Sequence, residues 1–206
     1  MPIREYKPTR SELLELRKRI KLSERGYKLL RMKRDSLILQ FFQVLDRAKE
    51  IRQRITEKYR IARQKLAVAE AVEGAVAIKS AAFALLEVPE MELSTKNVMG
   101  IVVPQIDARS VRKRLDERGY GIIETSARID EAAEAYENLV EDIVVAAEAE
   151  TTMRKLLDEI EKTKRRVNAL EFTVIPELKA AESFIRMRLE EMERENIFRL
   201  KMLKEA

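Results

Sequence analysis

Residues 9 to 66 read TRSELLELRKRIKLSERGYKLLRMKRDSLILQFFQVLDRAKEIRQRITEKYRIARQKL, and this stretch decides the fold. Apolar or small side chains recur in it at alternating steps of three and four residues, with one skipped place: Leu13, Leu16, Ile20, Ser23, Tyr27, Leu30, Leu37, Phe41, Val44, Ala48, Ile51 and Ile55. This spacing is typical of a heptad seam, along which one α-helix packs against another. Thr9 and Glu12 have the spacing of a capping box, which begins a helix. The sequence therefore predicts a long coiled-coil helix, about 90 Å in length at about 1.5 Å per residue.

The seam then shifts by a four-residue stutter to Tyr59, Ala62, Leu66 and Ala69. A second seam runs from about Thr125 nearly to the C-terminus, through Ala133, Tyr136, Val140, Ile143, Ala147, Met153, Leu157, Ile160, Val167, Leu170, Val174, Ala181, Ile185 and Met192. Pro176 lies inside this second seam, where its missing N–H predicts a helix bend and not an end. The two seams predict an antiparallel intramolecular coiled coil with a head at one end and both termini at the other.

The middle of the chain, residues 67–124, predicts this small head, between an N-terminal helix over 1–66 and a C-terminal helix over 125–206. Residues 90–95 and 98–106 predict two short strands joined at about Lys96-Asn97, a β-hairpin. Its candidate functional residues are Val98, Met99, Gly100, Ile101 and Pro104. After it, Asp107 is expected to cap a short basic helix carrying Arg109, Arg112, Lys113 and Arg114, which ends at Gly119-Tyr120-Gly121. The fold class is all-α dominated.

Composition excludes many other classes of protein. Ala, Glu, Lys, Leu and Arg make up 114 of 206 residues, and 5 Gly and 5 Pro are too few for the turns of an all-β or βαβ fold. The chain has no His and no Cys, which removes the common metal ligands and thiol nucleophiles. Carboxylate pairs such as Glu191 with Glu195 lie on a helix face without a pocket, and no phosphate-binding loop is present. We expect a non-catalytic protein without a cofactor. No run approaches the ~20 apolar residues of a membrane span, so we also expect a cytoplasmic chain.

Charge is distributed unevenly along the sequence. Residues 1–65 carry 20 basic and 8 acidic side chains, whereas residues 124–150 carry 1 basic and 9 acidic. The two regions attract one another if they pack side by side, and the remaining basic face is either simply solvated or binds an acidic partner. Interleaved acidic residues and the absence of an aromatic cluster favour a protein partner over nucleic acid. The candidate contact residues are Arg17, Lys21, Arg25, Lys28, Arg31, Arg34, Arg165, Arg166, Asn168 and Glu171.

Three motifs resemble one known family. Residues 165–171, RRVNALE, followed by Pro176 and by LEEMERENIFRLK over 189–201, resemble the C-terminal helix of the D subunit of the archaeal A-type and V-type rotary ATPases. Pro8-Thr9 and GYKLLRMKRD over 26–35 are similar to the first helix of that family, and NVMGIVVP over 97–104 is similar to its hairpin. The resemblance covers essentially the whole chain in order.

The resemblance implies a rotor shaft in the central stalk. Its coiled coil would enter the barrel of alternating A and B subunits, bind the small F subunit along its side, and rest on the funnel-shaped C subunit (d-type) that couples to the membrane ring. ATP is bound and turned over by A and B, while this chain transmits torque. It would be peripheral to the cell membrane, without direct insertion and without nucleic acid.

Two other classes also fit the pattern. A prefoldin-like chaperone subunit joins two coiled-coil helices through β-hairpins, although such a chain would be shorter and would form a hexamer. A homodimeric coiled-coil scaffold is the other alternative. The role of the hairpin is likewise open, either as a cap that closes the end of the coiled coil or as a surface that docks a partner or modulates activity.

Overall fold

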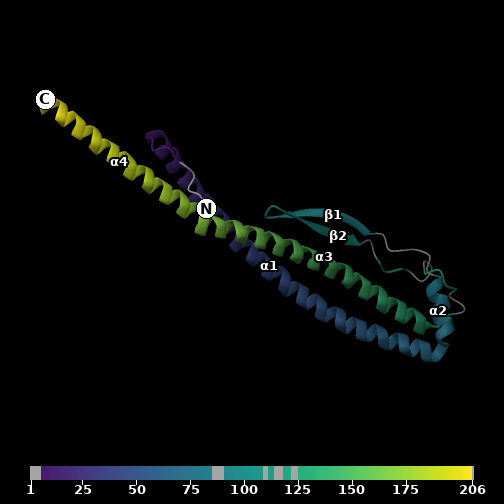
Figure 1. The fold of residues 1–206 in the computed structure, drawn as a ribbon. Helices are drawn as coiled ribbons and strands as arrows, with labels where there is room; N and C mark the ends of the chain where they lie inside the picture. Colours follow the sequence, from purple (N-terminus) through teal and green to yellow (C-terminus); the bar gives the residue numbers. More distant parts are fainter. Residues whose placement is uncertain (1–5, 85–90, 109–110, 114–117, 122–124, 206) are drawn as a thin grey trace. The chain divides into compact units, whose positions relative to one another are not determined.

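The structure is a computed structural model that describes residues 6–84, 91–108, 111–113, 118–121 and 125–205. Its elements, in chain order, are α1 (Arg10–Glu73), α2 (Ala75–Phe83), β1 (Met91–Val98), β2 (Ile101–Ala108), α3 (Ala127–Ala169), the π-helical turn η2 (Leu170–Val174) and α4 (Ile175–Glu205). Figure 1 shows long helices at both ends of the chain and one small hairpin between them, which confirms the predicted fold class. None of the helices in the described residues has the length and apolar content needed to cross a membrane.

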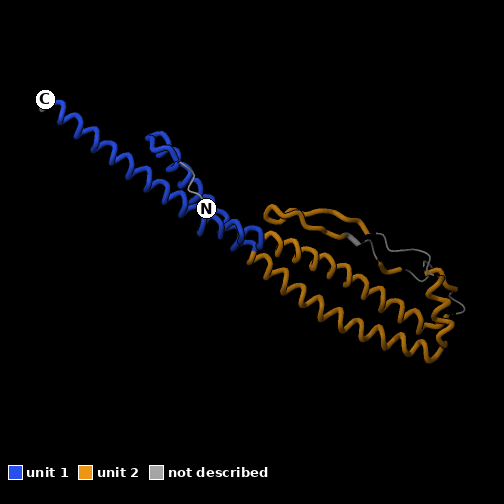
Figure 2. The backbone as a smooth tube through the Cα atoms, in the orientation of Figure 1, with its two compact units in different colours: residues 1–37, 160–206 blue, residues 38–159 orange. Residues whose placement is uncertain are grey.

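The chain divides into two compact units, drawn in different colours in Figure 2. The first unit joins residues 1–37 to residues 160–206, so it pairs the start of α1 with α4. Arg17 Nε lies 2.8 Å from Glu182 Oε1, and Lys179 Nζ lies 2.8 Å from Glu24 Oε1. Residue numbers fall along α4 as they rise along α1, so the pairing is antiparallel, as predicted.

The heptad seam of α1 is confirmed by burial. Leu16, Ile20, Leu37 and Ile51 are buried, and the other seam positions up to residue 55 are at least half-buried. Thr9 Oγ1 accepts a hydrogen bond from the Glu12 N–H at 3.2 Å, which confirms the predicted helix start.

The stutter is correct at Ala62 and Ala69, which are fully buried, but wrong at Tyr59, whose side chain is 49% exposed. Lys58 takes the inward place instead, because its Nζ pairs with Asp142 Oδ2 at 2.7 Å. A long side chain with a charged end can lie along the helix interface and still reach a carboxylate at its edge.

The second unit, residues 38–159, pairs the remainder of α1 with α3 and carries α2 and the hairpin. The predicted α3 seam is displaced by one position in four places, where Ala132, Leu139, Val144 and Leu156 are buried instead of their apolar neighbours. The predicted residues were Ala133, Val140, Ile143 and Leu157, of which Ile143 and Leu157 are nearly half exposed. Adjacent apolar residues satisfy either register, so the pattern alone does not identify the inner one.

The hairpin is confirmed, but its turn is not where the sequence placed it. Val98 pairs with Ile101, so the loop is Met99-Gly100, and Lys96 and Asn97 belong to β1. Both loop residues have positive φ, 53° for Met99 and 86° for Gly100, as a two-residue hairpin turn requires. The Asn97 side-chain oxygen accepts the Gly100 N–H at 2.8 Å, so Asn97 supports the turn from the strand.

The short basic helix after the hairpin is also a wrong prediction. Asp107 lies in β2 as the strand partner of Glu92. Residues 111–113, including Arg112 and Lys113, are not helical, while Arg109 and Arg114 lie outside the described residues. Strand pairing with β1 extends through Ala108, which leaves no room for a helix start at Asp107.

The hairpin packs along α3, as Figure 1 shows. Lys155 Nζ donates to the Val102 carbonyl oxygen at 2.8 Å, and Glu148 Oε2 accepts the Ile106 N–H at 3.1 Å. Ile101 and Val103 of β2 are buried. These contacts lie more than twenty residues into α3, so the interpretation of the hairpin as a cap over the helix ends is wrong.

Pro176 is the second residue of α4, and α4 follows η2 directly. The Ile175 N–H donates to the Leu170 carbonyl oxygen, five residues earlier, so the hydrogen-bond ladder widens by one residue just before the proline. The chain stays helical to Glu205, as predicted, and the effect of Pro176 takes the form of a π turn.

Candidate functional site

The predicted basic residues of α1 fall into two groups. Arg17 and Arg34 are engaged within the chain, with Glu182 and with Asp35, whose Oδ1 lies 2.8 Å from Arg34 Nη2. Lys21, Arg25, Lys28 and Arg31 are exposed, and no ion pair to them is found among the described residues. The second group presents positive charge to the surroundings at helical spacing and is the better candidate for contact with a partner.

The predicted residues before Pro176 lie in the same unit. Arg165 pairs with Glu161 one helical turn earlier, and Arg166 and Asn168 are exposed beside the buried Val167. Glu171 lies in the π turn and lines a cleft with Tyr27, Lys28 and Lys179. The unit thus brings Glu171 and Lys28 together, although they are far apart in the sequence.

The ion pair of Glu24 with Lys179 at this cleft was not predicted from the sequence. A hydrogen bond from Lys179, and then its positive charge, hold the pKa of Glu24 below the ordinary value, with a smaller contribution from Lys28. Nothing in the seam distinguishes Glu24 from other exposed carboxylates on α1, so only the fold identifies its partner.

Replacing Lys179 with methionine is expected to return the pKa of Glu24 toward the ordinary carboxylate value. A carboxylate whose pKa is lower in the folded state stabilises the fold at pH values above its unfolded-state pKa. This stability is lost as the pH falls through the lowered pKa. Carboxyl carbon shifts of Glu24 followed by NMR against pH measure the change directly. Replacing Lys162 with methionine is the control and should leave Glu24 unaffected. An unchanged Glu24 titration in Lys179→Met would contradict the assigned cause.

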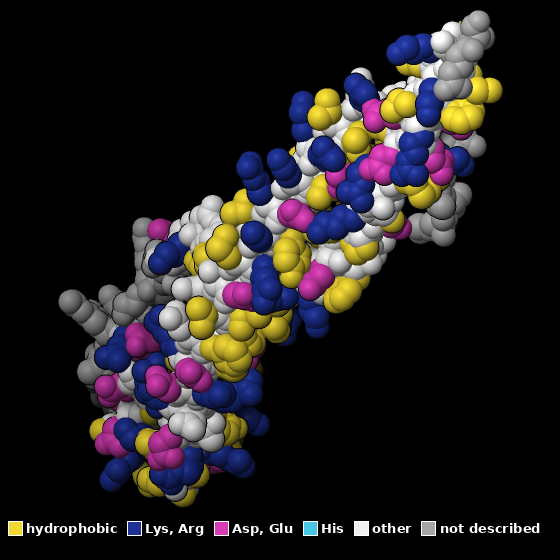
Figure 3. Space-filling view, turned by 90° about the vertical axis from the view of Figure 1, so that its left-hand side faces the viewer, with side chains coloured by type: hydrophobic (Ala, Val, Ile, Leu, Met, Phe, Trp, Pro, Cys, Tyr) yellow, Lys and Arg dark blue, Asp and Glu magenta, His cyan; other side chains and the backbone are white. Residues whose placement is uncertain are grey.

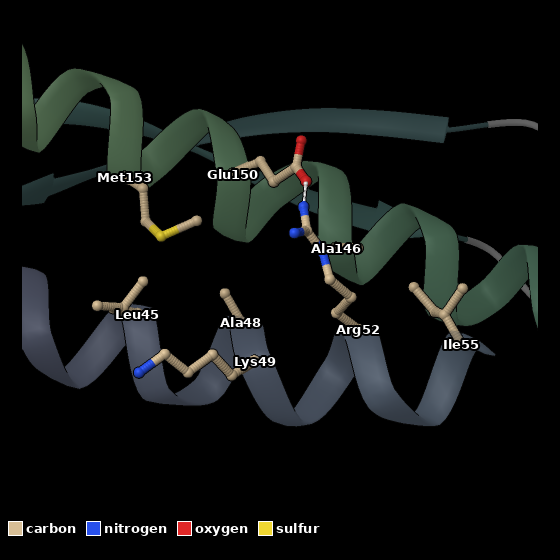
Figure 4. A pocket seen from close by; sticks show the side chains of 8 residues that line it. All are labelled: Leu45, Ala48, Lys49, Arg52, Ile55, Ala146, Glu150 and Met153. Atoms are coloured by element: carbon tan, nitrogen blue, oxygen red, sulfur yellow. Dashed lines mark hydrogen bonds and ion pairs between the residues drawn. The ribbon is translucent and has the colours of Figure 1, made fainter. Parts of the chain in front are cut away.

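A second cleft lies between α1 and α3 in the other unit (Figure 4). It encloses about 300 Å³ and is lined by Leu45, Ala48, Lys49, Arg52, Ile55, Ala146, Glu150 and Met153. The small side chains of Ala48 and Ala146 leave space between the helices, and Arg52 bridges the rim to Glu150, with Nη2 3.3 Å from Oε1. It is an apolar groove with charged edges, which suits the packing of an apolar side chain better than catalysis.

Arg118 anchors the segment that leads into α3. Its side chain is buried, and Nε and Nη2 donate to the two Glu137 carboxylate oxygens at 3.1 and 3.0 Å. Desolvation alone would lower the pKa of Arg118, but hydrogen bonds with Glu137 and Tyr120 offset it, so the pKa is raised. The Tyr120 hydroxyl donates to Asp130 at 2.7 Å, and burial, with this bond, raises its pKa to about 12. We assign this network a structural role, because Arg118 and the carboxylates of Glu137 and Asp130 already pair with one another.

Exposed apolar side chains are numerous for a chain of this charge. Leu22, Leu29 and Leu39 on α1 are each more than 60% exposed, and Ile197, Phe198, Leu200 and Leu203 near the end of α4 are similarly exposed. Figure 3 shows hydrophobic side chains standing among Lys, Arg, Asp and Glu on one face of the molecule. Mixed apolar and charged surfaces of this kind are typical of proteins that other chains cover.

These features define a class of protein, the coiled-coil component of a larger assembly. The features are antiparallel helices linked by ion pairs, a hairpin attached to them, and apolar side chains that remain exposed. The comparisons with known proteins agree with this class and make it specific. The family model for the D subunit of ATP synthase matches residues 12–205. The chain belongs to this ATP synthase D-subunit family.

Curated relatives cover the whole length. The A-type ATP synthase D subunit of Methanococcoides burtonii is 61% identical over 206 residues, which is 100% of both chains. That of Methanosarcina acetivorans is 60% identical over 99% of this chain and 98% of its own, and that of Halobacterium salinarum is 53% identical over 98% and 90%. This chain is therefore part of an ATP synthase complex and partners with other subunits of it.

Proposed function

We propose that this chain is the rotor shaft of the central stalk, transmitting torque between the A and B subunits and the ion-translocating rotor of the membrane. The observation that supports this proposal is the antiparallel helix pair, linked across its interface by ion pairs in both units. Each exposed pair adds only about 0.2–1 kcal/mol, so the pairs contribute register more than stability. A fixed register resists sliding of one helix on the other, which torque transmission requires.

The partners follow from the same proposal. The A and B subunits bind and turn over ATP, this chain contributes no catalytic group, the F subunit binds along its side, and the funnel-shaped C subunit joins it to the membrane ring. The exposed basic side chains of Lys21, Arg25, Arg31 and Arg166 meet acidic surfaces of A and B as the shaft turns. The chain is accordingly peripheral to the membrane.

Reversing the charges of Arg25, Arg31 and Arg166, together with that of the neighbouring exposed Arg165, by changing each to Glu, is expected to weaken coupling. At about 0.4 kcal/mol for each surface charge, four reversals cost about 1.5 kcal/mol, which should lower ATP-driven ion transport per ATP hydrolysed by about tenfold. Reconstituted complex in vesicles measures both rates together. The isolated chain should keep its helical circular dichroism, because these side chains are exposed.

The matched control changes the same four residues to Lys, which keeps the charge and should retain most of the coupling. Wild-type coupling in the fourfold Glu variant, with the complex intact, would remove the support for electrostatic torque contacts. Loss of assembly in the Glu variant alone would assign the charges to binding and not to torque.

A further inference from the structure

The hairpin has two long edges, and they differ in what covers them. Hydrogen-bonded and non-hydrogen-bonded pairs alternate along an antiparallel ladder, starting from the hydrogen-bonded pair that closes a two-residue turn. Here Val98 and Ile101 close the turn. Every second residue of each strand therefore directs its N–H and C=O away from the partner strand, toward an edge.

Contacts of β2 confirm this alternation. The Val102 carbonyl oxygen accepts Lys155 Nζ, and the Ile106 N–H donates to Glu148, so both groups point away from β1. Pro104 lies between them, at a position whose backbone groups also point away from β1, and it has no N–H to donate. The edge of β2 is thus occupied by side chains of α3 and by a proline.

The edge of β1 is open. The strand partners of Val102, Pro104 and Ile106 are Asn97, Thr95 and Leu93, so these three β1 residues direct their backbone groups outward. Among the described residues, none donates to or accepts from these backbone groups. β1 is exposed over Met91–Asn97, and the Leu93 side chain is 75% exposed. An edge of this kind is a template for a further strand.

The outer face of the hairpin is apolar beside this edge. Side chains alternate between faces, so Met91, Leu93 and Val102 share the face opposite to the buried Ile101 and Val103. Val102 is 54% exposed and Met91 is 48% exposed. Lys96 lies at an inner-face position of β1 and is exposed, so the edge carries a positive charge near the turn.

We propose that the open edge of β1 binds an extended segment of another ATP synthase subunit, which adds as a third strand to the hairpin. Main-chain bonds to Leu93, Thr95 and Asn97 hold the segment, and charge complementarity to Lys96 fixes which of its residues lies nearest the turn. The segment carries an acidic side chain opposite Lys96 and an apolar one beside Leu93. The proposal rests on membership in the complex and not on torque.

Amide hydrogen exchange on the free chain and on the assembled complex tests this proposal. In the free chain, the amides of Thr95 and Asn97 should exchange freely, while those of Ser94 and Lys96 are protected by the ladder. In the complex, exchange at Thr95 and Asn97 should slow by at least about 100-fold. Unchanged exchange there would overturn the proposal, and so would equal protection produced by self-association of the free chain.

Thr95→Pro provides the specific variant. It removes an outward N–H without breaking a bond to β2, since Thr95 faces Pro104. We expect the variant complex to lose the added protection at Asn97, while Thr95→Val, which keeps the N–H, retains it. Reversing the charge of Lys96, as Lys96→Glu, should also accelerate exchange at Asn97 by about tenfold or more. Protection that survives both variants contradicts strand addition, whatever the outcome of a rotation assay.

Discussion

Replacing Arg118 with methionine is expected to lower the free energy of unfolding by about 3–5 kcal/mol, the largest effect of any single substitution considered for this chain. The Arg118 side chain is 6% exposed and Glu137 is 15% exposed, so the substitution leaves a buried carboxylate without its cation. Asp130 and Tyr120 lose a shared partner at the same time. Urea unfolding followed by circular dichroism measures the difference.

Two variants separate charge from geometry at this position. Arg118→Lys keeps the charge but cannot form the paired bonds to both Glu137 oxygens, so it should recover only part of the loss. Arg118→Met combined with Glu137→Leu removes both charges of the closest pair and should be more stable than Arg118→Met alone, because the Glu137 carboxylate is no longer left without its cation. A single Arg118→Met variant as stable as the unmodified chain would show that the network contributes nothing.

Replacing Ile185 with alanine is expected to cost about 3 kcal/mol and to melt the first unit locally. Ile185 is fully buried and packs with Leu16 and Ala181 in the core of the first unit. A helix pair has little other core to compensate for the cavity. Hydrogen exchange should therefore accelerate in residues 10–37 and 160–205, while the second unit keeps its protection.

Phe184→Ala is the matched control, since it removes a larger apolar side chain from the adjacent position, which is 42% exposed. The control should cost less than about 1 kcal/mol. Equal losses for the two variants would mean that the seam through Ile185 is not the interface between the helices.

Sequence periodicity predicted the helices of this chain well because most seam positions of α1 stand alone among polar residues. It failed where apolar residues are adjacent, as at Leu139 and Val140, because either one completes the stripe. The hairpin turn was misplaced because Asn97 is a common turn residue, yet here its side chain supports the turn from the preceding strand. Met99 at positive φ is a poor local choice that the flanking strand pairs enforce.

The candidate site was less accessible to sequence reasoning. The sequence shows the basic residues of α1, but their division depends on which acidic residues α4 brings opposite: Arg17 has an ion pair, and Arg25 has none among the described residues. Arg118 carried no signal, because its importance comes from burial between segments distant in sequence. The open edge of β1 became apparent only once the register showed which backbone groups point outward.

Rotation of this chain inside the assembled complex tests its role as a shaft most directly. The chain has no Cys, so Val76→Cys on α2, where the side chain is 83% exposed, gives a single labelling site within it. With the A and B subunits fixed to a surface, a probe on residue 76 should turn in one direction while ATP is hydrolysed and stop when ATP is removed. A probe that stays still while hydrolysis proceeds at the full rate would contradict the proposed function.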